Sequence, residues 1–192
     1  MGKNFSRNNA TGLRRKSDFY ETPYSITQHL LRRENLDYNK TCLEPACGNG
    51  AIVKVLSPLW GSNIVAYDKE TDFLKETKTY PYVITNPPYS LAYDFVIKAK
   101  EVCTDKICML LPLSYLHGKK RYDSIYQDTT FPLEKVYVFT RYPMLGDPLR
   151  EDGKYKTGMM VYAWYVWSRD YKGEPMIAWI DNNSDVLSKK DQ

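Results

Sequence analysis

The sequence predicts an α/β fold built on a mostly parallel sheet, and three observations support this. Short, almost continuously apolar runs alternate with segments of helical pattern between residues 42 and 113. Such runs are typical of parallel strands that helices cover on both faces. Polar loops that contain glycine, proline or acids follow three of the runs. Beyond residue 130, strand-like runs follow one another with few helices between them, which predicts antiparallel strands at one edge of the sheet.

The first helix is predicted to begin at Thr22 and Pro23, a capping hydroxyl followed by a proline at the first helical position. Its apolar face, from Ile26, Leu30 and Leu31, reaches about residue 34. Further helices are predicted from about residue 51 and over residues 91–102. Strands are predicted to end near residue 44 and to cover residues 62–68, 82–85, 106–113, 133–139, 159–167 and 176–180.

The length of 192 residues suits one domain with a core of its own, which we place at residues 18–192. Residues 1–17 form a basic arm, predicted to be flexible, with five Lys or Arg residues and no acid. Such an arm is either a solvated terminus or a segment that contacts phosphate. The net charge of +4 permits nucleic-acid binding without requiring it.

Several protein classes are disfavoured. The sequence has no apolar run of 18 residues, and its first residues lack the apolar centre of a signal peptide. We therefore expect a soluble, cytoplasmic protein with no membrane partner. The four cysteines form no C-x-x-C pair and have no histidine cluster near them, so neither a metal site nor a disulfide framework is predicted.

Three loops carry the candidate chemistry, because ligands of open α/β sheets bind beyond the carboxyl ends of the strands. In the loop Glu44–Gly50, glycine allows a tight turn and a close approach to a ligand. A second loop carries Asp68, Asp72 and Phe73, where a carboxylate can accept from ribose hydroxyls and an acid beside an aromatic ring can hold adenine. Taken singly, these features are also explained by a tight turn, a helix cap and a core aromatic.

The third loop is Asn86-Pro87-Pro88-Tyr89. The two prolines end a strand and leave carbonyl groups without partners in the chain. The side-chain oxygen of Asn86 and the carbonyl of Pro87 can accept both hydrogens of a planar amino group, which makes its nitrogen a better nucleophile. Tyr89 offers a face on which a flat ring can stack. Because asparagine removes no proton at neutral pH, the turn predicts transfer to an amine or amide nitrogen rather than hydrolysis.

The segments LEPACGNG and NPPY resemble the class I S-adenosylmethionine-dependent amino-methyltransferases, and the order of motifs is similar to that of gamma-type adenine-N6 DNA methyltransferases. The spacing, with ITNPPYSLAYDFVIKA and YAWYVW, also resembles small methyltransferases encoded by phages. This resemblance covers about residues 18–115. It implies a Rossmann-like sheet, S-adenosylmethionine as the cofactor and, for a phage-encoded chain, a place in the host cytoplasm.

The resemblance also implies a role for each matching residue. The target amine, on a base flipped from its stack, would be positioned by Asn86, Pro87, Pro88 and Tyr89. The cofactor would be held by Tyr20, Thr22, Pro23, Glu44, Pro45, Ala46, Gly48, Gly50, Asp68, Asp72, Phe73 and Asn86. Candidate substrate contacts are Tyr89, Arg141, Lys119 and Lys120, with a solvated helix end as the alternative for the two lysines.

The sequence departs from that family in two places. Only three residues separate Asp68 from Asp72, too few for the helix and strand that the family places there. Either acid can therefore be the ribose ligand, and the sheet can lack one strand. The chain also has no separate target-recognition domain; the loop from Arg141 to Lys156 is either a substrate loop or an ordinary surface loop.

Three functions remain open. The one that we prefer is methylation of an exocyclic amino group of a nucleic-acid base, adenine N6 in DNA ahead of RNA, with a short recognition sequence or a partner protein that supplies specificity. The second is methylation of a protein glutamine, disfavoured because fewer than fifty residues precede Gly48. The third is a non-catalytic binding module, against which the complete Asn86–Tyr89 turn argues.

Overall fold

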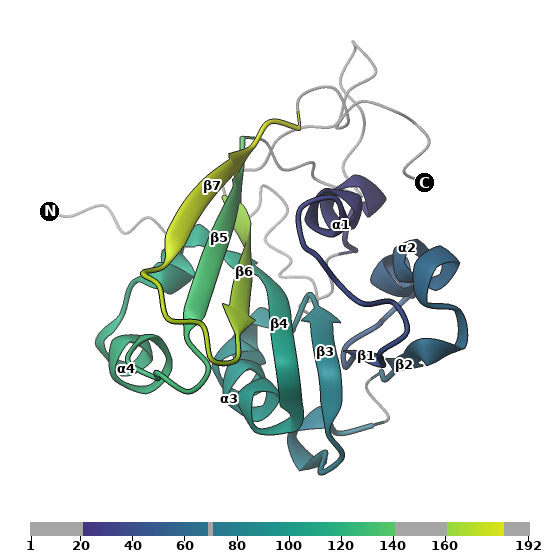
Figure 1. The fold of residues 1–192 in the computed structure, drawn as a ribbon, viewed down its shortest axis with the longest axis horizontal. Helices are drawn as coiled ribbons and strands as arrows, with labels where there is room; N and C mark the ends of the chain where they lie inside the picture. The colour runs from purple at the N-terminus through teal and green to yellow at the C-terminus, as the bar shows by residue number, and fades with distance from the viewer. Residues whose placement is uncertain (1–20, 69–70, 141–160, 183–192) are drawn as a thin grey trace, which may run out of the picture.

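The computed structural model describes residues 21–68, 71–140 and 161–182 (Figure 1). These residues form one seven-stranded sheet in the order β2-β1-β3-β4-β6-β5-β7. The strands are β1 Cys42–Glu44, β2 Ile64–Ala66, β3 Tyr80–Thr85, β4 Cys103–Pro112, β5 Leu133–Phe139, β6 Tyr162–Ser168 and β7 Met176–Ile180. The predicted α/β class is confirmed.

The parallel and antiparallel parts of the sheet are divided as the sequence predicts, with one difference. The strands β2, β1, β3 and β4 pair in parallel, whereas β6 is antiparallel to both β4 and β5. β7 then pairs in parallel with β5. The antiparallel strand β6 therefore lies inside the sheet rather than at its edge, because β5 and β7 extend the sheet beyond it. At the other end β2 is the edge strand, and the described part of the chain adds no strand beyond it.

Helices cover both faces of the sheet (Figure 1). α1 (Tyr24–Leu31) and α2 (Ala51–Trp60) lie on one face, over a core that includes Ile26, Leu56, Ile84 and Trp164. α3 (Ala92–Val102) lies on the other face, over a core that includes Val83, Phe95, Met109 and Tyr165. Apolar side chains alternate between the two cores along β4, as the pleat of a strand requires.

Several local features differ from the sequence-based predictions. α1 begins one residue later than expected, at Tyr24, and ends at Leu31 rather than near residue 34. The Thr22 hydroxyl does not cap it; that hydroxyl accepts a hydrogen bond from Asn86 instead. The short helix α4 (Lys119–Arg121) agrees with the solvated helix end that the sequence offered for Lys119 and Lys120. The helical turn Tyr122–Tyr126 was not predicted, because its apolar side chains are too few to show a period. Within the described residues, no helix is both long and apolar enough to cross a bilayer.

Candidate functional site

A cavity of about 460 Å³ lies beyond the carboxyl ends of β1, β2 and β3. It is bounded by the loops that follow these strands and by Glu21 and Thr22, which precede α1. Among the residues predicted to bind the cofactor, Thr22, Glu44, Pro45, Ala46, Gly48, Asp68, Asp72, Phe73 and Asn86 line it. The three loops that the sequence singles out therefore meet in one place, as expected for neighbouring parallel strands.

Glu44, the last residue of β1, is fully buried in the wall of the cavity. Its Oε1 atom accepts hydrogen bonds from the Thr85 hydroxyl at 2.5 Å and from the Ala46 N–H at 2.9 Å. Its Oε2 atom is buried and has no hydrogen-bond partner among the described residues. Burial raises the pKa of this carboxyl to about 8, against the opposing effect of the two hydrogen bonds. A cationic group placed beside Oε2 would stabilise the carboxylate and relieve this cost.

The loop after β1 is tied to the chain that follows β2. The Cys47 N–H donates to the Tyr67 carbonyl at 2.8 Å, and the Tyr67 N–H donates to the Glu44 carbonyl at 2.9 Å. Gly48 and Gly50 have φ angles of 49° and 76°, a region that favours glycine. Burial raises the pKa of the Cys47 thiol, which keeps it protonated at neutral pH. The loop is thus a fixed, neutral wall of the cavity.

The two acids of the second loop have different surroundings. The Asp72 carboxylate accepts from the Leu74 N–H at 3.1 Å and pairs with Lys75 Nζ at 3.1 Å. It therefore caps the short helix Phe73–Lys75, the simpler of the two explanations that the sequence allows. The Asp68 side chain is exposed and lines the cavity. Of the two, Asp68 is the acid whose carboxylate is not engaged in a helix cap.

The Asn86-Pro87-Pro88-Tyr89 turn follows β3 directly. Asn86 Nδ2 donates to the Thr22 hydroxyl at 3.0 Å, which fixes the plane of the amide. The Leu91 N–H donates to the Pro88 carbonyl at 2.9 Å. The chain therefore provides a partner for this carbonyl, which the sequence predicted to have none. Asn86, Pro87 and Pro88 all line the cavity.

Tyr89 does not line the cavity but packs beside it. Its ring stacks on that of Tyr162, the first residue of β6, with 5.5 Å between centroids and 29° between planes. Tyr162 is buried and lies next to Pro112, the last residue of β4. One face of the Tyr89 ring is therefore covered by a residue from the far end of the sequence, a contact that no local motif indicates.

Other predicted site residues lie elsewhere. Pro23 and Gly50 do not line the cavity; Pro23 precedes α1, and Gly50 precedes α2 as its N-cap residue. Lys119 and Lys120 are exposed on α4, with Lys120 Nζ 3.5 Å from the centre of the Tyr93 ring. Tyr20, Arg141, the basic arm at residues 1–17 and the loop 141–156 lie outside the described residues. In the chain that the structure describes, no three His, Cys, Asp or Glu side chains form a metal site.

Some residues of the cavity wall were not predicted from the sequence. Cys47 and Asn49 belong to the first loop and could have been included on position alone. Ile52, Leu91 and Phe95 add to the apolar lining. Their only signal is an apolar position in a helix or turn, which is the same signal that core residues give.

No protein-family model and no curated protein matches the sequence. Solved structures do match the fold. A candidate RNA methyltransferase from Pyrococcus horikoshii is 16% identical with a TM-score of 0.54, over 79% of this chain and 88% of that one. A modification subunit of a candidate type I restriction enzyme from Vibrio vulnificus is 10% identical with a TM-score of 0.60, over 84% and 47%. A candidate class I S-adenosylmethionine-dependent methyltransferase from Listeria monocytogenes is 11% identical with a TM-score of 0.58, over 85% and 65%.

These similarities establish the fold. The chain has the Rossmann-like sheet found in structures of class I S-adenosylmethionine-dependent methyltransferases. It spans about half of the Vibrio vulnificus subunit and about two thirds of the Listeria monocytogenes protein.

Proposed function

We propose that this protein is an S-adenosylmethionine-dependent N-methyltransferase that acts on an exocyclic amino group of a nucleic-acid base. The observation that carries the proposal is the convergence, on one cavity, of the buried Glu44 carboxyl, the exposed Asp68 carboxylate and the Asn86-Pro87-Pro88 turn. The cavity lies at the carboxyl edge of a sheet of methyltransferase type.

The residues of the cavity fit the cofactor. Its volume of about 460 Å³ lies in the usual range for small-molecule sites. Glu44 Oε2 would accept from the ammonium group of the methionine part, and Asp68 from the ribose hydroxyls. Phe73 and Leu74 give an apolar surface for the adenine ring. When bound, the cofactor supplies an electrophilic methyl group.

The turn after β3 would hold the target amine. The Asn86 side-chain oxygen and the Pro87 carbonyl accept its two hydrogens, which draws the nitrogen lone pair out of conjugation. The hydrogen bond from Asn86 Nδ2 to Thr22 supports this role, because it fixes the orientation of the side-chain amide and therefore the direction in which its oxygen points. Positioning of this kind is the main contribution that a protein makes to a direct displacement.

Adenine N6 in DNA is the acceptor that we favour, ahead of RNA. The Vibrio vulnificus neighbour is named as a modification subunit of a candidate type I restriction enzyme, and the Pyrococcus horikoshii neighbour as a candidate RNA methyltransferase. A flipped base would stack on the ring of Tyr89 at the end of this turn. Lys119 and Lys120, both exposed on α4, would contact phosphates. We propose that a partner protein supplies sequence specificity.

The test is transfer of a labelled methyl group from S-adenosylmethionine to duplex DNA, single-stranded DNA, total RNA and a protein lysate. We expect label on duplex or single-stranded DNA, recovered after digestion as N6-methyladenine. Label on RNA alone would change the substrate but keep the reaction. Label on protein alone would favour glutamine methylation, and no binding of S-adenosylmethionine would refute the proposal.

A further inference from the structure

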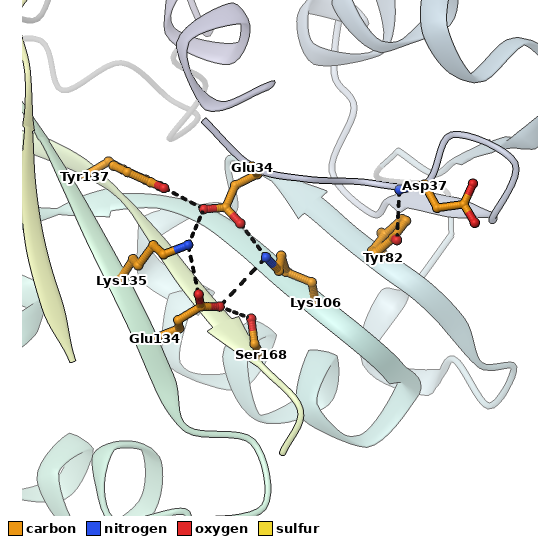
Figure 2. Close-up of polar contacts among 8 residues, drawn as sticks. All are labelled: Glu34, Asp37, Tyr82, Lys106, Glu134, Lys135, Tyr137 and Ser168. Atoms are coloured by element: carbon orange, nitrogen blue, oxygen red, sulfur yellow. Dashed lines mark hydrogen bonds and ion pairs between the residues drawn. The ribbon is translucent and has the colours of Figure 1, made fainter. Parts of the chain in front are cut away.

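A largely buried cluster of charged side chains joins the segment that follows α1 to β4 and β5 (Figure 2). Glu34, fully buried, pairs with Lys106 of β4 and with Lys135 of β5 and accepts from the Tyr137 hydroxyl at 2.6 Å. Glu134 joins the cluster through both lysines, with its carboxylate 2.8 Å from Lys135 Nζ and 3.8 Å from Lys106 Nζ. The cluster therefore contains two acids and two bases, and its charges balance.

Such a cluster carries a desolvation cost that apolar side chains between a helix and a sheet do not have. Burial of ion pairs costs free energy that their attraction only partly returns, and apolar replacements are often as stable. Burial lowers the pKa of Lys106, but the hydrogen bond and charge of Glu34 outweigh this effect and raise the pKa overall. Unlike an apolar contact, a charged pair of this kind fixes one relative position of its two elements, since a shift leaves a buried charge unpaired.

Glu34 lies three residues beyond α1 and is hydrogen-bonded to its last turn. Its own N–H donates to the carbonyl of Leu30, in the last turn of that helix, at 3.0 Å. The middle of α1 is fixed as well, because Trp164 Nε1 of β6 donates to the Ile26 carbonyl at 2.9 Å. At the opposite end, Thr22 lies two residues before the helix and accepts from Asn86. A helix of eight residues, about 12 Å long, thus joins the charged cluster to the turn that lines the cavity.

We propose that Glu34 is a positioning residue: through its pairs with Lys106 and Lys135 it sets the placement of α1, and thereby holds the Thr22 hydroxyl against Asn86. The effect on methyl transfer rests on the proposed function, but the effect on Asn86 does not. Glu34 does not line the cavity, so we assign its effect to the placement of α1.

The experiment observes the side-chain amide of Asn86 directly in the full-length protein labelled with ¹⁵N. Its resonances are assigned by their loss in Asn86→Ala. We expect Glu34→Gln to move them toward their positions in Thr22→Val, and to cause no further change when combined with Thr22→Val. Asp128→Asn is the matched control, because Asp128 pairs at 2.9 Å with Lys100, another largely buried lysine, on the α3 side of the sheet. It should leave the Asn86 resonances in place.

Unchanged Asn86 resonances in a folded Glu34→Gln protein would overturn the proposal, as would an equal change in Asp128→Asn. If Glu34→Gln does not fold, Tyr137→Phe, which removes one hydrogen bond to Glu34 and no charge, takes its place with a smaller shift in the same direction. In parallel, Glu34→Gln should slow methyl transfer from S-adenosylmethionine roughly three- to tenfold, but not in the Thr22→Val background. Failure of the wild type to bind S-adenosylmethionine would refute the proposed function, whereas the side-chain amide resonances of Asn86 would still test the role of Glu34.

Discussion

At the scale of single residues, the site depends on carboxyl groups placed in different surroundings. Glu44 is buried with one oxygen engaged and the other without a partner among the described residues, whereas Asp68 is exposed. Asp72, close to Asp68 in sequence, uses its carboxylate in a helix cap and a surface ion pair. The chemistry of each acid therefore follows from its neighbours rather than from its residue type.

The raised pKa of Glu44 predicts a pH dependence of stability. Its ordinary value of 4.5 applies to the unfolded chain, and burial raises it to about 8 in the folded protein. Between these values the folded protein holds a proton that the unfolded chain releases, so the free energy of unfolding falls as pH rises, by at most about 1.4 kcal/mol per pH unit. Urea unfolding of wild type and Glu44→Gln from about pH 5 to 8 measures the difference. Parallel curves for the two proteins would contradict the prediction.

Cofactor binding should show the opposite trend. A cationic ligand binds the ionised form of Glu44, so the affinity for S-adenosylmethionine should rise with pH up to about 8. Calorimetric titration of Glu44→Gln should give a weaker affinity without this rise. A rise of the same size in the variant would assign it to another group.

The two neighbouring acids should differ on substitution. Asp68→Asn should weaken S-adenosylmethionine binding about 10- to 100-fold, because a charge-assisted hydrogen bond to ribose is lost. Asp72→Asn should change it less than about threefold, since an asparagine oxygen still accepts from the Leu74 N–H. The reverse order in calorimetry would make Asp72 the ribose ligand.

At the scale of elements, the short loops do two separate tasks. Gly48 lines the cavity, whereas Gly50 does not and instead precedes α2 in a left-handed conformation. The GNG segment is thus partly a cofactor wall and partly a helix start. A sequence pattern cannot separate these tasks, because glycine is favoured in both.

Substitution of Gly48 and Gly50 should separate the two tasks, lining the cavity and starting α2. Gly50→Ala should lower the free energy of unfolding by about 1–2 kcal/mol, the cost of a left-handed alanine, and leave S-adenosylmethionine affinity unchanged. No atom within 4 Å obstructs a Cβ at Gly50, so strain is the only cost. Gly48→Ala should lose both stability and affinity. Weak binding by Gly50→Ala would place it in the cavity wall after all.

At the scale of the whole molecule, the fold was largely predictable because its signals are local. The seven strand-like runs correspond to seven strands; β5 and β7 match the predicted ranges, and the ends of the other strands differ by at most three residues. The convergence of the loops after Glu44, Asp68 and Thr85 followed from the rule for parallel sheets. Contacts between distant segments were not predictable: the stacking of Tyr162 on Tyr89 and the pairing of Glu34 with Lys106 depend on the final packing.

The exposed lysines of α4 give a prediction about the whole surface. Affinity for duplex DNA is expected to fall with salt concentration. If Lys119 and Lys120 each contact one phosphate, replacing both with alanine should make the slope of log affinity against log salt less steep by about 2. Lys172→Ala, which removes an exposed lysine between β6 and β7, is the control and should leave the slope unchanged. A slope that falls equally in both proteins would remove α4 from the interface.

The proposed role of Asn86 is tested most sharply by comparing cofactor binding and methyl transfer in wild type and Asn86→Ala. Because Asn86 is proposed to hold the target amine, labelled methyl transfer to DNA should fall at least about a hundredfold. The dissociation constant of S-adenosylmethionine should stay within about threefold, because Glu44 and Asp68 still hold the cofactor. An equal loss of binding and transfer, or transfer that persists in Asn86→Ala, would show that Asn86 does not hold the target amine.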